Sequence, residues 1–290
     1  MAKPLRKAIF PVGGLGTRFL PATKSMPKEM LPVVDKPLIQ YAVEEARAAG
    51  VEQFIFVTGR GKTAIEDHFD RSIELELTLE SRGRQDALDE LKSWMPEPGQ
   101  IAYVRQQEPL GLGHAVWCAR ELVGDEPFAV LLADDLILAD VPCLKQMADA
   151  QAASGGNVIA TMEVAREHTD RYGVIDSNGA PGKLMPVHGL VEKPDPADSP
   201  SCNAVIGRYI LMPEVFEELE RKETGAGGEI QLTDAMAKLI GRHPFHALSF
   251  EGRRFDCGNK LGFLEANVAF ALSRDDLGAE WREVMRSYRD

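Results

Sequence analysis

The stretch of sequence that decides the fold is AIFPVGGLGTRFLPATKSMPKEMLP, residues 8–32 of a 290-residue chain. Its apolar start predicts a buried strand over residues 7–12, and a glycine-rich loop follows directly. Because glycine has no Cβ, the backbone N–H groups of such a loop can approach a phosphate closely. We therefore expect a binding site for a polyphosphate nucleotide. The loop residues expected to form it are Gly13, Gly14, Gly16 and Thr17, with the cationic side chains of Arg18, Lys24 and Lys28 beside them.

The basic character of this stretch is local. Residues 1–28 contain six Lys/Arg and no Asp/Glu, whereas the whole chain has a formal net charge of -12. Net acidity argues against a nucleic-acid partner, because binding a phosphate backbone requires an extended basic surface. The basic segment is better explained as a pocket for one small anion.

Two familiar glycine motifs are excluded. A dinucleotide fingerprint, G-x-G-x-x-G, would need its third glycine where Phe19 stands. Residues 61–63 read GKT, like the end of a P-loop, but the first glycine of that motif would fall at Phe56. The loop is also long and contains prolines, so it does not run straight into a helix as those motifs do.

Strand-like runs alternate with helical patterns through the first half of the chain. Strands are predicted at residues 7–12, 53–58, 101–106 and 128–133, and helices at 38–49, 62–69, 112–122 and 143–152. This alternation predicts an α/β fold with a mostly parallel or mixed central sheet flanked by helices. Residues 72–94 are charged and helix-favouring, and predict one or two further helices.

From residue 157 onward strands dominate. They are predicted at 158–164, 173–176, 184–191, 203–211 and 245–250, with helices at 213–221 and 230–240. We expect a single domain over residues 1–290. Residues 1–156 would mainly bind the nucleotide, residues 157–260 would form a smaller β-rich part, and residues 261–290 a helical tail.

The apolar runs and the cysteines indicate the cellular compartment to expect. The longest apolar run, residues 128–133, is far shorter than the ~20 residues that a membrane helix requires. The start of the chain has no signal-peptide pattern, and the four cysteines form no C-x-x-C pair. We therefore expect a reduced, cytoplasmic protein without a membrane partner.

The glycine loop as a whole, residues 13–32, closely resembles the signature loop of the sugar-1-phosphate nucleotidylyltransferases. Five further segments resemble that family in the expected order: GLGHA (111–115), YGV (172–174), VEKP (191–194), GEIQLTDA (228–235) and DCGNK (256–260). The similarity spans nearly the whole chain, and the longer match is similar to the bacterial UTP–glucose-1-phosphate uridylyltransferase branch. The resemblance implies the Rossmann-like nucleotide-diphospho-sugar transferase fold, a sugar-phosphate-binding part over residues 157–260, and a homo-oligomer, either a dimer or a tetramer.

Two acids are candidates for a metal site. Asp134 directly follows the predicted strand 128–133, and ligands of open α/β sheets bind at the carboxyl ends of strands. By resemblance it would hold Mg²⁺ together with Asp256, and Mg²⁺ usually takes one or two carboxylates plus phosphate oxygens and waters. A helix N-cap or an Asx turn is the alternative for Asp134. Asp135 is expected to cap or to contact substrate.

The resemblance also implies contacts to the base and the sugar. Gln106 would bind the uracil edge, because an amide can donate and accept, and Gly111 would let the backbone approach the base. Gly173 and Glu192 would contact the hexose, and Lys193 its phosphate. The alternatives are an ordinary polar group at the end of a strand for Gln106 and a solvated ion pair for Glu192 and Lys193. The roles of Lys24 and His114 stay open.

The implied reaction is the formation of UDP-glucose and pyrophosphate from UTP and α-D-glucose 1-phosphate. The sugar phosphate is already an anionic nucleophile, so the protein has to supply in-line positioning and neutralisation of charge. Arg18 would hold the departing pyrophosphate and Lys28 would act near the α-phosphate, which makes these two the candidate catalytic residues. A dTTP-using thymidylyltransferase remains an alternative, since one methyl group is worth only ~1–3 kcal/mol. A catalytically silent nucleotide-sugar sensor on the same fold is the other.

Overall fold

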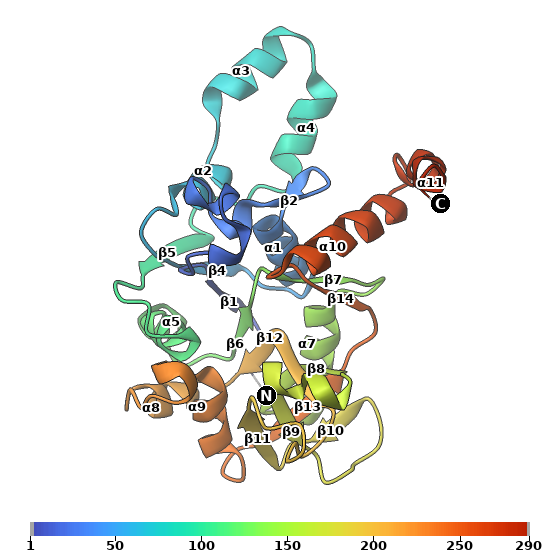
Figure 1. The fold of residues 1–290 in the computed structure, drawn as a ribbon. Coiled ribbons are helices and arrows are strands. Elements are labelled where there is room, and N and C mark those ends of the chain that lie inside the picture. Colours follow the sequence, from blue (N-terminus) through green and yellow to red (C-terminus); the bar gives the residue numbers. More distant parts are fainter. Residues whose placement is uncertain (1–2, 289–290) are drawn as a thin grey trace.

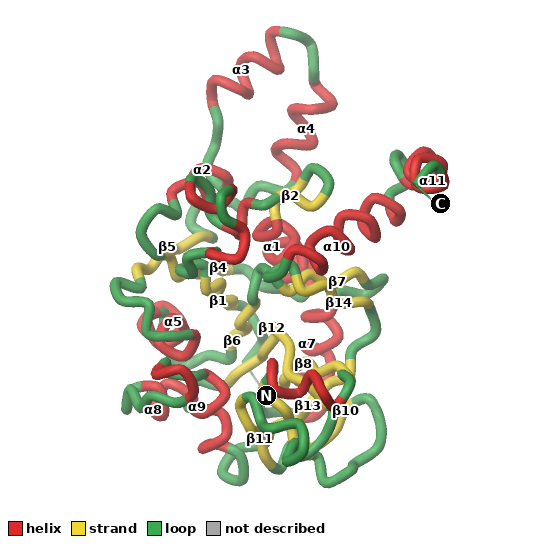
Figure 2. Tube along the Cα trace, viewed as in Figure 1, coloured by secondary structure: helices red, strands yellow, loops and turns green. Residues whose placement is uncertain are grey.

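The computed structural model describes residues 3–288. A ten-stranded mixed sheet runs through the molecule, with eight strands along its main path in the order β10-β13-β8-β12-β6-β1-β4-β5 (Figures 1 and 2). The parallel block consists of β6 (Phe128–Leu131), β1 (Lys7–Pro11), β4 (Gln53–Thr58) and β5 (Ile101–Arg105). The expected α/β class with a mixed, helix-flanked sheet is therefore confirmed.

The second part of the sheet departs from parallel order. Its central strand, β12 (Asn203–Leu211), runs antiparallel to both β6 and β8 (Asn157–Glu163). β13 (Phe245–Ser249) lies parallel to β8, and β10 (Leu184–Pro186) closes this edge. β12 is buried along nearly its whole length, so it joins the two parts of the sheet into one continuous core.

Helices cover both faces of the sheet, as the alternation predicts. One face packs against α1 (Leu38–Ala48) and α7 (Cys143–Ser154), the other against α5 (Leu112–Cys118), α8 (Val215–Leu219) and α9 (Leu232–Leu239). The remaining α-helices are α2 (Thr63–His68), α3 (Ile73–Ser81), α4 (Gln85–Ser93), α6 (Arg120–Val123), α10 (Lys260–Ser273) and α11 (Gly278–Arg286). In Figure 1 the α3–α4 hairpin projects away from the sheet, and α10 leads out to α11 at the C-terminal end. Within the described residues no helix is long and apolar enough to cross a bilayer.

Two predicted elements are wrong in detail. The strand predicted at residues 184–191 is two strands, because the chain crosses from β13 to β9 (Gly173–Asp176) after β10 and continues as β11 (Gly189–Glu192). The helix predicted at residues 112–122 is split into α5 and α6 at Ala119.

Two small antiparallel ribbons were missing from the sequence prediction. β2 (Pro32–Val33) pairs with β3 (Lys36–Pro37), and β7 (Asp135–Leu138) pairs with β14 (Arg253–Asp256). The second ribbon matters most, because its register places Asp256 opposite Asp135. It thereby brings two acidic segments together that are far apart in the sequence.

Candidate active site

The glycine loop folds around the Lys28 side chain. It continues as three short 3₁₀ turns, Thr17–Phe19, Ala22–Lys24 and Lys28–Met30, rather than as an α-helix. Gly16 has a φ of 66°, and a Cβ on it would lie 3.1 Å from Lys28 Cβ. Glycine is therefore required at position 16 both by its backbone conformation and by the close approach of Lys28.

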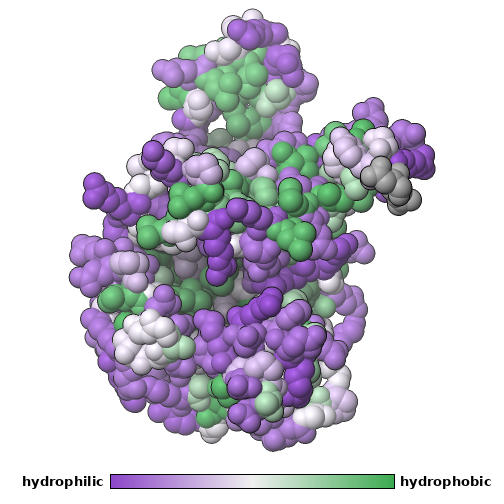
Figure 3. Space-filling view, viewed as in Figure 1, coloured by the Kyte–Doolittle hydropathy of each residue, from purple (hydrophilic) through white to green (hydrophobic). Residues whose placement is uncertain are grey.

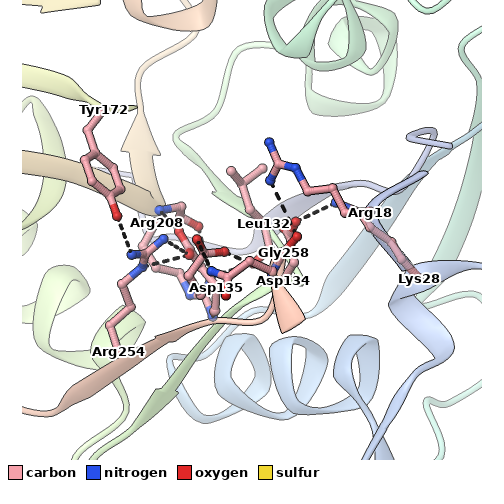
Figure 4. Close-up of polar contacts among 12 residues, drawn as sticks. Arg18, Lys28, Leu132, Asp134, Asp135, Tyr172, Arg208, Arg254 and Gly258 are labelled. Atoms are coloured by element: carbon pink, nitrogen blue, oxygen red, sulfur yellow. Dashed lines mark hydrogen bonds and ion pairs between the residues drawn. The ribbon is translucent and has the colours of Figure 1, made fainter. Parts of the chain in front are cut away.

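Lys28 meets the first candidate metal ligand. Its Nζ lies 2.5 Å from Asp134 Oδ2, and each side chain is 25% exposed. Arg18 comes from the other side of the loop, with Nη1 3.5 Å from Gly258 O (Figure 4). Lys28 thus contacts the turn that carries Asp134, whereas Arg18 contacts the turn that follows β14.

The Lys28–Asp134 pair is charged at neutral pH. Burial works against ionisation of Asp134, but the Lys28 ammonium outweighs it and holds the pKa of the carboxyl below its ordinary value. Burial also opposes the charge on Lys28, yet Asp134 and Glu29 together raise the pKa of its ammonium. Each group therefore stabilises the ionised form of the other, and Asp134 remains a carboxylate.

Asp256 is held in place at the end of β14. Its Oδ1 accepts a hydrogen bond from Gly258 N at 2.9 Å, and its Oδ2 accepts one from Asn259 Nδ2 at 2.8 Å. Asn259 in turn caps α10 by accepting from Gly262 N. The helix cap and the turn after β14 therefore fix the orientation of this carboxylate.

Asp134 and Asp256 face one point in space. A Cβ added to Gly258 would lie 2.9 Å from Asp256 Oδ1 and 3.1 Å from Asp134 Oδ2. The two oxygens are therefore separated by no more than the sum of these distances. Asp134 itself lies in the turn between β6 and β7, since β6 ends at Leu131, slightly earlier than predicted.

Two carboxylates at one point fit a hard divalent cation. Within residues 3–288 no group of three or more His, Cys, Asp or Glu side chains is arranged to hold a metal ion by itself. Mg²⁺ does not need such a cage, because it typically uses one or two carboxylates and completes its shell with phosphate oxygens and water. The donor set of Asp134 and Asp256 therefore suits Mg²⁺ that arrives with a nucleotide.

Asp135 belongs to a separate network on the other side of the turn. Its Oδ1 accepts from Arg254 Nε at 2.8 Å, and its Oδ2 accepts from Gly207 N at 2.6 Å. Arg254 Nη1 also donates to Tyr172 Oη at 3.2 Å. Burial opposes the charge on Arg254, but Asp135 raises the pKa of its guanidinium above the ordinary value. Asp135 thus ties together β7, β12 and β14 (Figure 4).

A fully buried arginine holds the same turn from β12. Arg208 donates to both oxygens of Glu45 on α1, at 3.0 and 2.8 Å. It also donates to Leu132 O at 2.9 Å and to Asp135 O at 2.7 Å. The sequence patterns did not single out Arg208 or Arg254, and they included Tyr172 only as part of the YGV segment. The signal for Arg208 was a single charged residue inside the apolar run NAVIGRYIL, residues 203–211.

The predicted sugar residues lie next to this centre. Gly173 and Glu192 pair across β9 and β11, and a Cβ on Gly173 would lie 3.3 Å from Glu192 Oε2. Lys193 Nζ lies 3.3 Å from Glu192 Oε1, and its side chain is half-exposed. All three line a cavity of about 260 Å³ that Asp134 and Asp256 also line. Figure 3 shows a hollow near the middle of one face of the molecule.

The predicted base residues lie together beside the glycine loop. Gln106 follows β5, and its Nε2 donates to Gly111 O at 3.1 Å. A Cβ on Gly13 would lie 3.0 Å from Gln106 Oε1. The structure also gives another reason for the glycine at 111, because a Cβ there would lie 2.8 Å from Ile230 O.

Known proteins resemble this chain along nearly its whole length. The nucleotidyl transferase family model matches residues 7–272. A UTP–glucose-1-phosphate uridylyltransferase from Komagataeibacter xylinus is 54% identical over 261 residues, which cover 90% of this chain and 92% of that protein.

Solved structures agree with the sequence match. A UTP-bound UGPase from Acinetobacter baumannii has a TM-score of 0.92 at 42% identity, covering 98% of this chain and 100% of that one. A UDP-glucose pyrophosphorylase complexed with UDP-glucose has a TM-score of 0.84 at 43% identity, covering 93% and 100%. The resemblance inferred from the motifs is confirmed, and the chain belongs to the nucleotidyl transferase family, among its UTP–glucose-1-phosphate uridylyltransferases.

Proposed function

We propose that this chain transfers the uridylyl group of UTP to α-D-glucose 1-phosphate and releases pyrophosphate. The observation that carries the proposal is the contact between Lys28 of the glycine loop and Asp134, which lines the same cavity as Gly173, Glu192 and Lys193. This contact joins the glycine loop, the acidic pair and the cavity, which are the three parts that the reaction would need for the nucleotide phosphates, the metal ion and the sugar phosphate. Relatives named for this reaction support the assignment.

The protein's part in the reaction is positioning and charge neutralisation. The oxygen of the sugar phosphate is an anionic nucleophile, so the attack on the α-phosphate needs no general base. Lys193 would hold the incoming phosphate, and Lys28 would stabilise the charge that grows on the α-phosphate oxygens. Arg18 and the backbone N–H groups of Gly13, Gly14, Gly16 and Thr17 would hold the departing pyrophosphate.

Asp134 and Asp256 would hold Mg²⁺. When bound, Mg²⁺ would neutralise phosphate charge and orient the reacting groups. Lys28 would also contribute to this arrangement. A phosphate of the bound nucleotide would offer its ammonium a second anionic partner besides Asp134.

Substrate choice would be made at the two ends of the site. Gln106 and Gly111 would bind the uracil, and Gly173 with Glu192 would bind the hexose hydroxyls. We also propose a homo-oligomer, a dimer or tetramer, because large apolar side chains are exposed on α3 and α10, among them Ile73, Leu77 and Leu261. The four cysteines, which all lie within residues 3–288, are unpaired there, in keeping with a reducing cytoplasm.

Pyrophosphate release tests the assignment. The purified chain is incubated with Mg²⁺ and each pairing of UTP or dTTP with glucose 1-phosphate or galactose 1-phosphate, and kcat/KM is compared. UTP with glucose 1-phosphate should be the best pair, and chelation should stop the reaction without unfolding the protein. Equal or better use of dTTP would favour a thymidylyltransferase, and no release with any pair would favour a silent sensor.

A further inference from the structure

Both N–H groups of the Gln106 side-chain amide have partners in the protein. Nε2 lies 3.1 Å from Gly111 O and 3.2 Å from His114 Nδ1. A carbonyl oxygen can only accept, so Gly111 fixes the amide with its nitrogen toward α5. His114 Nδ1 then faces a donor and has to accept, which requires the neutral ring with its proton on Nε2.

The Gln106 amide therefore has one polar atom left for a ligand. Oε1 points toward the glycine loop, 3.0 Å from where a Gly13 Cβ would lie. Against a pyrimidine this atom can accept a hydrogen bond but cannot donate one. Uracil carries a donor at N3, whereas cytosine carries an acceptor there and would face Oε1 with lone pair against lone pair.

We propose that His114 is a positioning and specificity-determining residue, which by accepting from Gln106 turns that amide into a pure acceptor that selects uracil over cytosine. The inference rests on the proposed role of Gln106 in base binding. It adds to the hold of Gly111 on the amide, because rotating the amide to present its nitrogen to cytosine would then break two hydrogen bonds instead of one.

The surroundings of His114 hold the ring in this position and in the neutral state. The ring stacks on Trp117 with a centroid separation of 5.8 Å and an interplanar angle of 18°. Cys118 Sγ lies 3.9 Å from Nε2. Burial lowers the pKa of His114, and of the nearby charged groups Glu108 works against this shift whereas Lys222 assists it.

Protonation of His114 should therefore weaken the selection. An N–H at Nδ1 would oppose the N–H of Gln106, and rotation of the amide would instead set Oε1 against Gly111 O. Either orientation leaves one unfavourable contact. The preference for UTP over CTP should fall as the pH is lowered from about 8 to about 5. Both nucleotides carry the same triphosphate, so its own titration cancels in their ratio. Cytosine also begins to protonate at N3 in mild acid, so His114→Asn, which has no titrating ring at this position, supplies the baseline for the pH dependence.

The test compares dissociation constants of UTP and CTP by titration calorimetry, without the sugar substrate. His114→Phe keeps a ring that can stack on Trp117 but removes the acceptor, and should lower the UTP/CTP preference by about tenfold, the worth of one hydrogen bond. His114→Asn offers an acceptor near the position of Nδ1 and should restore most of the preference. Cys118→Ser, beside the ring but away from Gln106, is the matched control and should not change the ratio.

Three outcomes would overturn the inference. They are an unchanged ratio in His114→Phe, an equal loss of affinity for both nucleotides, and a wild-type ratio that varies with pH no more than the ratio of His114→Asn. Gln106→Ala separates the inference from the role on which it rests. If that variant loses the preference and His114→Phe does not, the base contact stands and the inference alone fails. If UTP is bound selectively but pyrophosphate is never released, the proposed function fails while the inference survives.

Discussion

Replacing Arg208 by methionine should strongly destabilise the protein. Arg208 is fully buried, and its guanidinium donates to both oxygens of Glu45 and to the backbone carbonyls of Leu132, Asp135 and its own neighbour Gly207. Methionine has an unbranched, apolar side chain that can fill much of the same space, but it offers no hydrogen-bond donor. The change therefore removes the charge and the hydrogen bonds while keeping much of the packing.

The size of the effect follows from the partners that Arg208 leaves behind. The carbonyls of Leu132 and Gly207 keep backbone donors at 3.2 and 2.9 Å. The Glu45 carboxylate, only 9% exposed, would keep Leu144 N at 3.0 Å as its hydrogen-bond donor within the described part of the chain. Removing one member of a buried pair costs about 3–5 kcal/mol. The free energy of unfolding of a whole domain is only about 5–15 kcal/mol, so a loss of this size should be readily measurable.

Urea unfolding followed by circular dichroism measures the effect. Adding Glu45→Leu to Arg208→Met removes the buried carboxylate that has lost its partner. The double variant should therefore regain about 2 kcal/mol or more of the lost free energy of unfolding. The matched control is Arg253→Met, because the Arg253–Glu265 pair is exposed, at 62% and 48%, and should change the free energy of unfolding by less than about 0.5 kcal/mol. A loss below about 1 kcal/mol in Arg208→Met, or no recovery in the double variant, would refute the reasoning.

Three further changes test the site. Lys28→Ala should lower kcat for pyrophosphate release by about 10²–10³, whereas Lys24→Ala, at an exposed position, should have little effect; equal losses would contradict the assignment. Asp256→Asn should raise the Mg²⁺ concentration needed for half-maximal activity, and an unchanged Mg²⁺ dependence would show that Asp256 is not a metal ligand. Lys28 outweighs burial and lowers the pKa of Asp134, so the stability that this ionised pair supplies is full above about pH 4 and is lost as the pH falls through the folded-state pKa. The difference in urea midpoint between the wild type and Asp134→Asn should therefore shrink in acid, and a difference that stays constant down to about pH 3 would contradict the pairing.

The strands that the sequence located best are those whose burial is local in origin. β4, β9 and β12 begin and end at the predicted residues, because each is a run dominated by apolar residues with polar residues, glycine or proline near its ends. The same reasoning failed for residues 184–191. There the chain exchanges one partner strand for another after Pro186, and the apolar pattern continues across the exchange.

The ribbon of β7 and β14 could not be predicted from local pattern. β14 reads RRFD, mostly charged, and gains its structure only by pairing with residues more than a hundred positions earlier. Because pairing depends on which segments the rest of the fold brings together, a short polar strand carries almost no signal of its own. The motifs nevertheless indicated Asp134 and Asp256 as candidates for one site. Resemblance to a family carries information on tertiary structure that the periodicity of a single sequence lacks.

The structure also separates the roles of two adjacent acids that the sequence could not rank from pattern alone. Asp135 is buried and accepts from Arg254 and Gly207 N, so most of its acceptor capacity is committed to holding strands together. Asp134 is partly exposed, and among the described residues Lys28 is the one side chain that donates to it. A carboxylate with free lone pairs beside a cation can exchange that cation for another, whereas one enclosed by an arginine and a backbone amide cannot do so without breaking the turn. The physical difference between the two residues is therefore the number of partners that each would have to release. This difference supports the proposal that Asp134 binds a ligand, whereas Asp135 stabilises the turn.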